Sequence, residues 1–211
     1  MGFLSGNKVL EEVTSPINGK IRVVKSLGLG TYIQVEAITQ SGGIVREIWK
    51  GTIREVSKFK ENVNDCLILG LGGGTVVAEI KKRWPKARIV GVDSDPEMIE
   101  LGQKYLGLSG VETKVVDAEE YSIQTYNEGD RYDLILIDIY LGRVYPPQFE
   151  RDDFLIRIRE LLAKGGVAIF NRLYYDEKRS EAMKFASKLE TVFPKVKYFH
   201  PEANIMFICS S

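Results

Sequence analysis

The sequence predicts an α/β protein built on a Rossmann-like, doubly wound and mostly parallel sheet. Short apolar runs alternate with helix-like segments from residue 66 to the end of the chain. Continuous apolar runs such as residues 66–69 are typical of parallel strands that are buried on both faces. A smaller antiparallel unit precedes this part, so we expect two domains, residues 1–60 and 61–211.

Residues 66–95 have the pattern strand, glycine turn, helix, strand. Gly70, Gly72 and Gly74 allow a tight turn that brings backbone N–H groups close to a ligand. Asp93 ends the second strand 23 residues after Gly70. This is close to the roughly 20-residue offset at which an acidic side chain meets a ribose hydroxyl. The unit therefore predicts a site for an adenosine-containing cofactor.

The N-terminal part has a different pattern. Residues 1–14 show little patterning, and short β-like runs between residues 20 and 50 are separated by turn clusters. They predict a small antiparallel meander, followed by a short helix over residues 52–60. Such a meander is too thin to be stable alone. We expect it to pack on the main domain or on a partner chain, and its edge strands predict self-association.

The rest of the chain continues the strand–helix alternation. Helices are expected after Asp95 and over residues 149–163 and 180–192, and a final hairpin is formed by VKYF and NIMFIC. Five residues each come directly after an apolar strand: Gly70, Asp93, Asp117, Asp138 and Asn171. Because the carboxyl ends of parallel strands share one sheet edge, these residues should gather there. Each one alone is explained equally well as a helix cap, but the set predicts a ligand site.

Composition excludes several classes of function. Lys+Arg and Asp+Glu are 29 each, so the net charge is zero. The chain therefore lacks the excess of basic residues that is typical of proteins that bind nucleic acid or an anionic membrane. No apolar run reaches the ~18 residues of a membrane span and no signal-peptide pattern is present, so we expect a cytoplasmic protein. Cys66 and Cys209 lie in apolar runs and are expected to be buried thiols. His200 is the only histidine, which excludes a histidine-based triad, and no metal-ligand spacing occurs, so no metal is expected.

The glycine pattern is G-x-G-x-G, with Thr75 where a dinucleotide site usually has its third glycine. An NAD-dependent dehydrogenase is therefore disfavoured. The segments GLGGG, VDSD, VVDAEEY, RYDLILID and LLAKGGVAIFN resemble, in this order, the class I S-adenosylmethionine-dependent methyltransferase fold. Within it, residues 15–173 are most similar to the spermidine synthase (aminopropyltransferase) family.

The resemblance implies a seven-stranded sheet with an antiparallel last strand, and a dimer. It implies that Asp93 binds the ribose, that Asp117 and Ala118 border the adenine, and that Gln40 faces the donor from the meander. In that family, the residue matching Asp138 accepts a proton from the attacking amine.

Departures from the family pattern concern the polyamine site. The family's GGGDGG turn is GLGGGT here, so Gly73 replaces an aspartate, and Leu141 replaces the second aspartate of D-S-S-D-P. The family's Tyr-His/Gln-Glu triplet is matched by Trp49-Lys50-Gly51. Carrying a dication such as putrescine into a water-poor site requires carboxylates. Each lost contact should cost roughly 1.5–3 kcal/mol, and Lys50 adds a positive charge.

We therefore expect an S-adenosylmethionine-dependent transferase of the spermidine-synthase-like branch that methylates an unidentified small molecule. Asp138 is the candidate base or substrate anchor, with capping of the following turn as the alternative. Trp49, Tyr140 and Tyr145 are candidates for shaping the acceptor site, although loop tyrosines are equally expected in packing. Two alternatives remain open. One is aminopropyl transfer from decarboxylated S-adenosylmethionine to an amine, and the other is a non-catalytic nucleoside-binding or scaffold protein.

Overall fold

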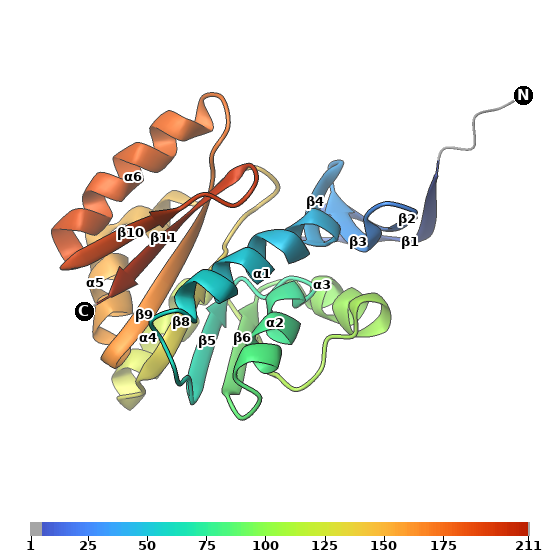
Figure 1. Cartoon of the computed structure of the whole chain (residues 1–211). Coiled ribbons are helices and arrows are strands. Elements are labelled where there is room, and N and C mark those ends of the chain that lie inside the picture. The colour runs from blue at the N-terminus through green and yellow to red at the C-terminus, as the bar shows by residue number, and fades with distance from the viewer. Residues whose placement is uncertain (1–5, 211) are drawn as a thin grey trace, which may run out of the picture.

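A computed structural model describes residues 6–210 and contains a seven-stranded and a four-stranded sheet (Figure 1). The larger sheet has the order β10-β11-β9-β8-β5-β6-β7. Its strands are β5 (Asp65–Leu69), β6 (Arg88–Asp93), β7 (Glu112–Val115), β8 (Tyr132–Ile137), β9 (Leu162–Leu173), β10 (Lys195–Phe199) and β11 (Asn204–Ser210). β5 to β9 are parallel, and β11 is antiparallel to both β9 and β10. The predicted α/β fold and its antiparallel last strand are confirmed.

Helices cover both faces of this sheet. One face carries α1 (Gly43–Val56), α2 (Thr75–Arg83) and α3 (Pro96–Leu101), and the other carries α4 (Ala118–Glu128), α5 (Asp152–Glu160) and α6 (Lys178–Val192). Leu67 and Leu69 pack in the α4–α6 core, whereas Cys66 and Ile68 pack in the α1–α2 core. Two buried faces explain why the strands are continuous apolar runs. A π-helix, η1 (Gly102–Leu106), extends α3, and a 3₁₀ turn, η2 (Pro147–Glu150), precedes α5.

The smaller sheet contains β1 (Asn7–Ser15), β2 (Gly19–Ser26), β3 (Gly30–Val35) and β4 (Ile38–Gly42), antiparallel and in chain order. The prediction of an unpatterned lead-in was wrong for residues 7–14, which form β1. That strand lies at the sheet edge and is mostly exposed, so backbone pairing with β2 holds it without an apolar pattern. The meander itself is confirmed.

Residues 43–49 were predicted as a strand but belong to α1. The buried side chains of this helix are Ile48, Trp49, Thr52, Ile53 and Val56, a helical spacing. A short segment of mixed apolar and charged residues fits both periods, and packing on the large sheet selects the helix. Similarly, the helix predicted over residues 149–163 is confined to η2 and α5, because Leu162 already begins β9.

The small sheet is attached to the large one through Asp95. Ser15 Oγ and Asn18 Nδ2 donate to Asp95 Oδ2 at 2.5 and 2.6 Å. Asp95 Oδ1 accepts from the Glu97 N–H at 3.0 Å and so caps α3. The β1–β2 turn is therefore fixed to the first turn of a helix that follows β6. The division into domains at residue 60 stays a prediction.

The two cysteines are free and buried, as predicted, and burial raises the pKa of both thiols. Within residues 6–210, no helix is both long enough and apolar enough to cross a membrane.

Candidate functional site

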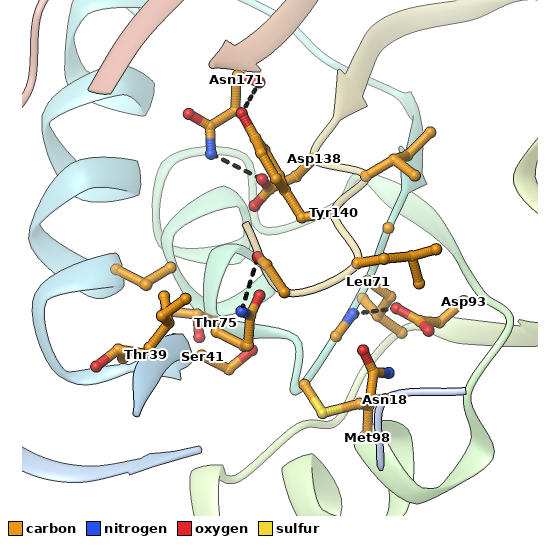
Figure 2. A pocket seen from close by; sticks show the side chains of 18 of the residues that line it. Asn18, Thr39, Ser41, Leu71, Thr75, Asp93, Met98, Asp138, Tyr140 and Asn171 are labelled. Atoms are coloured by element: carbon orange, nitrogen blue, oxygen red, sulfur yellow. Dashed lines mark hydrogen bonds between the residues drawn. The ribbon is translucent and has the colours of Figure 1, made fainter. Parts of the chain in front are cut away.

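A cavity of about 730 Å³ lies at the carboxyl ends of β5, β6, β8 and β9, and β4 and α1 form its other wall. Five residues that follow predicted strands line it together: Gly70, Asp93, Asp117, Asp138 and Asn171. Figure 2 shows Asp138 and Tyr140 beside Asn171, and Asp93 beside Asn18 and Met98 in another part of the same cavity. The structure thus brings the predicted sheet-edge residues to one concave site.

Most of the other sequence-predicted site residues also line this cavity: Gln40, Trp49, Gly72, Ala118 and Tyr140. Gly74 does not. It has a φ of +72°, and a Cβ there would lie 2.2 Å from Leu108 Cδ1, so glycine is required for the start of α2 to pack.

Tyr145 was predicted to shape the acceptor site, but it does not line the cavity. Its ring is buried and lies 5.4 Å from the ring of Tyr140 and 5.8 Å from that of Phe185. The Arg172 guanidinium lies 4.0 Å from its ring centre. Tyr145 therefore packs behind Tyr140, and of these two loop tyrosines only Tyr140 lines the cavity.

The backbone N–H groups of the glycine turn are paired within the protein, whereas the sequence predicted that they would face a ligand. Their acceptors are Val92 O for Gly70 and Leu71 (both 2.9 Å), Asp93 Oδ2 for Gly72 (2.6 Å), Ser41 Oγ for Gly73 (2.8 Å) and Leu71 O for Gly74 (2.9 Å). The turn is consequently a rigid floor for the cavity. A Cβ at Gly70 would lie 2.2 Å from Asp138 O, which explains the need for glycine there.

Asp93 connects this floor to the ligand space. Its carboxylate accepts from Gly72 N–H and, through Oδ1, from Asp95 N–H at 2.9 Å. Burial raises the pKa of Asp93, and these two N–H donors oppose that rise. A carboxylate has about four lone-pair sites, so further acceptor capacity remains for hydroxyl groups in the cavity.

Asp117 has a capping role as well as a place in the cavity wall. Its Oδ1 accepts from the N–H groups of Glu119 and Glu120 at 2.8 and 3.2 Å, at the start of α4. This holds Ala118, which also lines the cavity, in the first turn of the helix.

Asp138 is held by donors from two distant elements. Its Oδ1 accepts from Asn171 Nδ2 at 2.7 Å and its Oδ2 accepts from Trp49 Nε1 at 3.1 Å. Burial raises the pKa of Asp138 to about 6, and the charge of Asp93 adds to this, whereas the two donors oppose it. Its partners lie on α1 and β9, so the alternative that it caps the following turn is not supported.

The triplet at residues 49–51 contributes to the cavity only through Trp49, which is 2% exposed. Lys50 points to the surface and pairs with Glu47 at 3.1 Å, and its side chain is 53% exposed. The expectation that Lys50 adds positive charge to the site was therefore wrong. A Cβ at Gly51 would contact Phe199 and not a ligand.

Gly73, which the resemblance matches to an aspartate of the aminopropyltransferase family, has no space for a larger side chain. A Cβ at Gly73 would lie 2.8 Å from Ile33 Cδ1, 2.9 Å from Ser41 Cβ and 3.0 Å from Leu106 Cδ1. The small sheet and η1 thus occupy the space that a larger side chain would need.

Sequence reasoning missed several residues that line the cavity: Asn18, Ser41, Arg143, Gln148, Tyr175 and Asn204. Asn18 is followed by the turn glycine Gly19, and Asn204 begins an apolar strand. These are signals for turns and strand ends, and neither one reports proximity to the sheet edge. Within residues 6–210, no group of three or more His, Cys, Asp or Glu side chains is placed to hold a metal ion.

Residues 66–166 match a protein family described as "Methyltransferase domain". This part of the chain is thus similar to a methyltransferase domain. It is 28% identical over 146 residues to the "Probable polyamine aminopropyl transferase" of Bifidobacterium longum, covering 69% of this chain and 32% of that protein. It is 31% identical over 151 residues to the eEF1A lysine and N-terminal methyltransferase homolog of Drosophila melanogaster, covering 67% of this chain and 22% of that protein. The chain spans about a third or less of these curated relatives.

Two solved structures are similar to this chain. Human methyltransferase-like protein 13 in complex with SAH (S-adenosylhomocysteine) has a TM-score of 0.64 and 25% identity, over 79% of this chain and 80% of that one. Spermidine synthase from Thermotoga maritima has a TM-score of 0.78 over 96% of this chain and 72% of that one. Its identity of 19% shows a shared fold, which includes the small N-terminal sheet.

Proposed function

We propose that this protein is an S-adenosylmethionine-dependent transferase that moves a methyl group to a small acceptor molecule. The observation that carries the proposal is a single cavity with two differently held carboxylates. Asp93 is fixed to the glycine turn by N–H groups, and Asp138 is buried between two side-chain donors. The matched methyltransferase domain contains both residues.

Asp93 would hold the ribose hydroxyls through its remaining lone pairs, while Asp117 and Ala118 would border the adenine. Gln40 approaches from β4, where its Nε2 donates to Gly142 O at 3.3 Å. That bond joins the small sheet to the loop after β8, so the two walls would enclose the cofactor between them. Bound S-adenosylmethionine supplies an electrophilic methyl group at a sulfonium centre, and the protein must mainly align the attacking atom with it.

Asp138 is the residue suited to accept a hydrogen bond or a proton from the acceptor. With a pKa of about 6 it is mostly charged at neutral pH, and it is basic enough to take a proton from an activated nucleophile. Trp49 and Tyr140 flank it in the cavity wall and would position the acceptor.

Aminopropyl transfer to a polyamine is the weaker candidate. A dicationic acceptor needs several carboxylates, yet the position of Gly73 has no room for one and Leu141 is 49% exposed. The acidic residues that line the cavity are Asp93, Asp117 and Asp138. Two of these three are committed to the cofactor in this proposal.

A second candidate acceptor is an amine on a protein. Leu141 lines the cavity and its side chain is 49% exposed. Val144, which is 60% exposed, is joined to Leu141 by two backbone hydrogen bonds of 3.0 Å. Exposed apolar groups beside a binding site often mark contacts with a macromolecule. The relative named as an eEF1A methyltransferase supports testing this acceptor class.

We also propose a homodimer that forms through the small sheet. Val9, Leu27 and Leu29 are 52%, 96% and 50% exposed there, and β1 is an edge strand. Light scattering at micromolar concentration tests this, and a monomer at that concentration contradicts it.

Calorimetry with three donors tests the proposed reaction. S-Adenosylmethionine and S-adenosylhomocysteine should bind more tightly than decarboxylated S-adenosylmethionine. A preference for the decarboxylated donor would favour aminopropyl transfer, and no binding of any donor at millimolar concentration would refute the proposal. Transfer of labelled methyl groups to panels of small amines and of proteins then separates the two acceptor classes.

A further inference from the structure

A chain of three polar side chains crosses three neighbouring strands behind the acceptor end of the cavity. Asn204 on β11 donates from Nδ2 to Asn171 Oδ1 on β9 at 2.7 Å. Asn171 donates from Nδ2 to Asp138 Oδ1, at the end of β8, also at 2.7 Å. Asn204 and Asn171 are 7% and 6% exposed, so water competes little for these bonds.

The direction of this chain follows from the chemistry of its members. A charged carboxylate only accepts hydrogen bonds, so Asn171 must turn its NH₂ group to Asp138 and its oxygen to Asn204. Asn204 must then present its own NH₂ group. On the other side of Asp138, the indole N–H of Trp49 can only donate. Both carboxylate oxygens of Asp138 therefore face donors, which favours the charged form.

Removing the donor at Asn204 would release this constraint. The amide of Asn171 could then rotate and present its oxygen to Asp138. A carboxyl that faces an amide oxygen is stabilised when it carries a proton, so the charged form would lose its advantage. Asn204 thus acts on Asp138 indirectly, through Asn171, although Asn204 and Asp138 line the same cavity.

The other ionisable groups around Asp138 do not take over the role of Asn204 in favouring the charged form of this carboxylate. The charge of Asp93 raises the pKa of Asp138. Tyr140 and Tyr145 follow in the next loop, and burial raises the pKa of both phenols, so they stay neutral. Arg172 lies against Tyr145 and pairs with Glu150 at 2.7 Å. Arg143 lines the cavity at its exposed rim. From α1, only Trp49 contacts the carboxylate, because Glu47 and Lys50 point to the surface.

We propose that Asn204 is a positioning residue which, by orienting the amide of Asn171, keeps Asp138 in its charged, hydrogen-bond-accepting form. The proposed function enters only through the role given to Asp138, because the protonation state itself is measurable without cofactor or acceptor. In the reaction, the effect of Asn204 would be to leave Asp138 free to accept a proton at neutral pH.

The indole N–H of Trp49 provides the readout, since it donates directly to Asp138. The chain has two tryptophans, so an ¹H–¹⁵N spectrum of the whole protein contains two indole signals, which a Trp49→Phe variant assigns. Trp84 donates to the backbone oxygen of Glu61 at 2.9 Å and serves as an internal control for folding. In the unmodified protein, the Trp49 signal should titrate with a midpoint of about 6.

Asn204→Leu removes the donor without adding charge, and Asn204→Asp replaces the donor by an acceptor of the same shape. Both should move the midpoint upward, by about 0.5–1 pH unit or more, because the charged form of Asp138 loses support. Asn127→Asp adds the same charge on an exposed face of α4 and should leave the midpoint unchanged.

A residue with a merely structural role would lower the stability of the protein without moving the midpoint. An unchanged midpoint in Asn204→Leu, with the Trp84 signal intact, would therefore overturn the inference. A Trp49 signal that does not respond between pH 4 and 8 in the unmodified protein would also overturn it. Failure to bind S-adenosylmethionine would refute the proposed function and leave this titration unaffected. If Asn204→Leu does not fold, Asn204→Ala, which removes the same donor without adding charge, decides by the same midpoint.

Discussion

The two ends of the cavity are built in different ways. At the cofactor end, the carboxylate of Asp93 accepts hydrogen bonds from the N–H groups of Gly72 and Asp95. Its donors therefore come from one continuous strand–turn–helix–strand unit. At the acceptor end, Asp138 on β8 is held by Trp49 from α1 and by Asn171 from β9. The first end is formed by local sequence, whereas the second exists only after distant elements have packed together. We therefore expect substitutions at the two ends to affect different properties.

The largest effect is expected from Asp93→Ala, which acts on the cofactor end. The change removes the proposed ribose contacts and the acceptor that holds Gly72 N–H. Hydrogen bonds to a charged group contribute about 1.5–3 kcal/mol each, so two lost contacts should weaken S-adenosylhomocysteine binding by about 100-fold or more. Calorimetry checks this. Asp152→Ala, at an exposed position on α5, is the control and should bind normally.

Asp138→Asn tests the acceptor end through the pH dependence of folding. Burial raises the pKa of Asp138 to about 6 in the folded protein, compared with about 3.9 in an unfolded chain. The folded state therefore binds this proton more tightly. Proton binding at Asp138 therefore adds to the free energy of unfolding. This contribution is complete below about pH 4 and is lost as pH rises through 6. A shift of about two units corresponds to about 3 kcal/mol.

Urea unfolding of the unmodified protein and Asp138→Asn at pH 4 and pH 7 measures this contribution. From pH 4 to pH 7, the free energy of unfolding should fall by up to about 3 kcal/mol more in the unmodified protein than in the variant. Equal pH dependence in the two proteins would contradict the raised pKa. Asp152→Asn should behave like the unmodified protein.

Gly73→Asp tests whether the cofactor end is closed to a polyamine-site carboxylate. The new Cβ would collide with Ile33 and Ser41, and overpacking of this kind costs about 1–3 kcal/mol. Urea unfolding should show this loss, and the variant should gain no affinity for the decarboxylated donor. Gly28→Asp is a matched control, because a Cβ at Gly28 meets no atom within 4 Å. A stable Gly73→Asp variant that prefers the decarboxylated donor would contradict the account.

Ser15→Ala should have the smallest effect, on the attachment of the small sheet. It removes the hydrogen bond from Ser15 Oγ to the buried Asp95, a loss of about 1–2 kcal/mol. Urea unfolding measures it, with the exposed Ser109→Ala as control. Because Asp95 N–H also binds Asp93, a small loss of cofactor affinity should accompany it. A stability loss no larger than that of Ser109→Ala would show that this contact does not hold the sheet.

The same contrast explains what the sequence could predict. Asp93 and the glycine turn were identifiable because their spacing along the chain is fixed by one local unit. Asp138 and Asn171 were predicted to lie at the sheet edge because each follows an apolar strand. Trp49 was a candidate, but its bond to Asp138 was not predictable, since residues 43–49 fit a strand as well as a helix. Asn204 carried the signal of a strand start but none for its place beside Asn171, because that place depends on an antiparallel strand set beside β9 by the tertiary fold.

A crystal structure with S-adenosylhomocysteine bound would test the central claim most directly. The account predicts the ribose hydroxyls hydrogen-bonded to Asp93, the adenine beside Asp117 and Ala118, and the sulfur facing the part of the cavity that contains Asp138. A ligand bound with its ribose away from Asp93, or electron density outside this cavity, would contradict it.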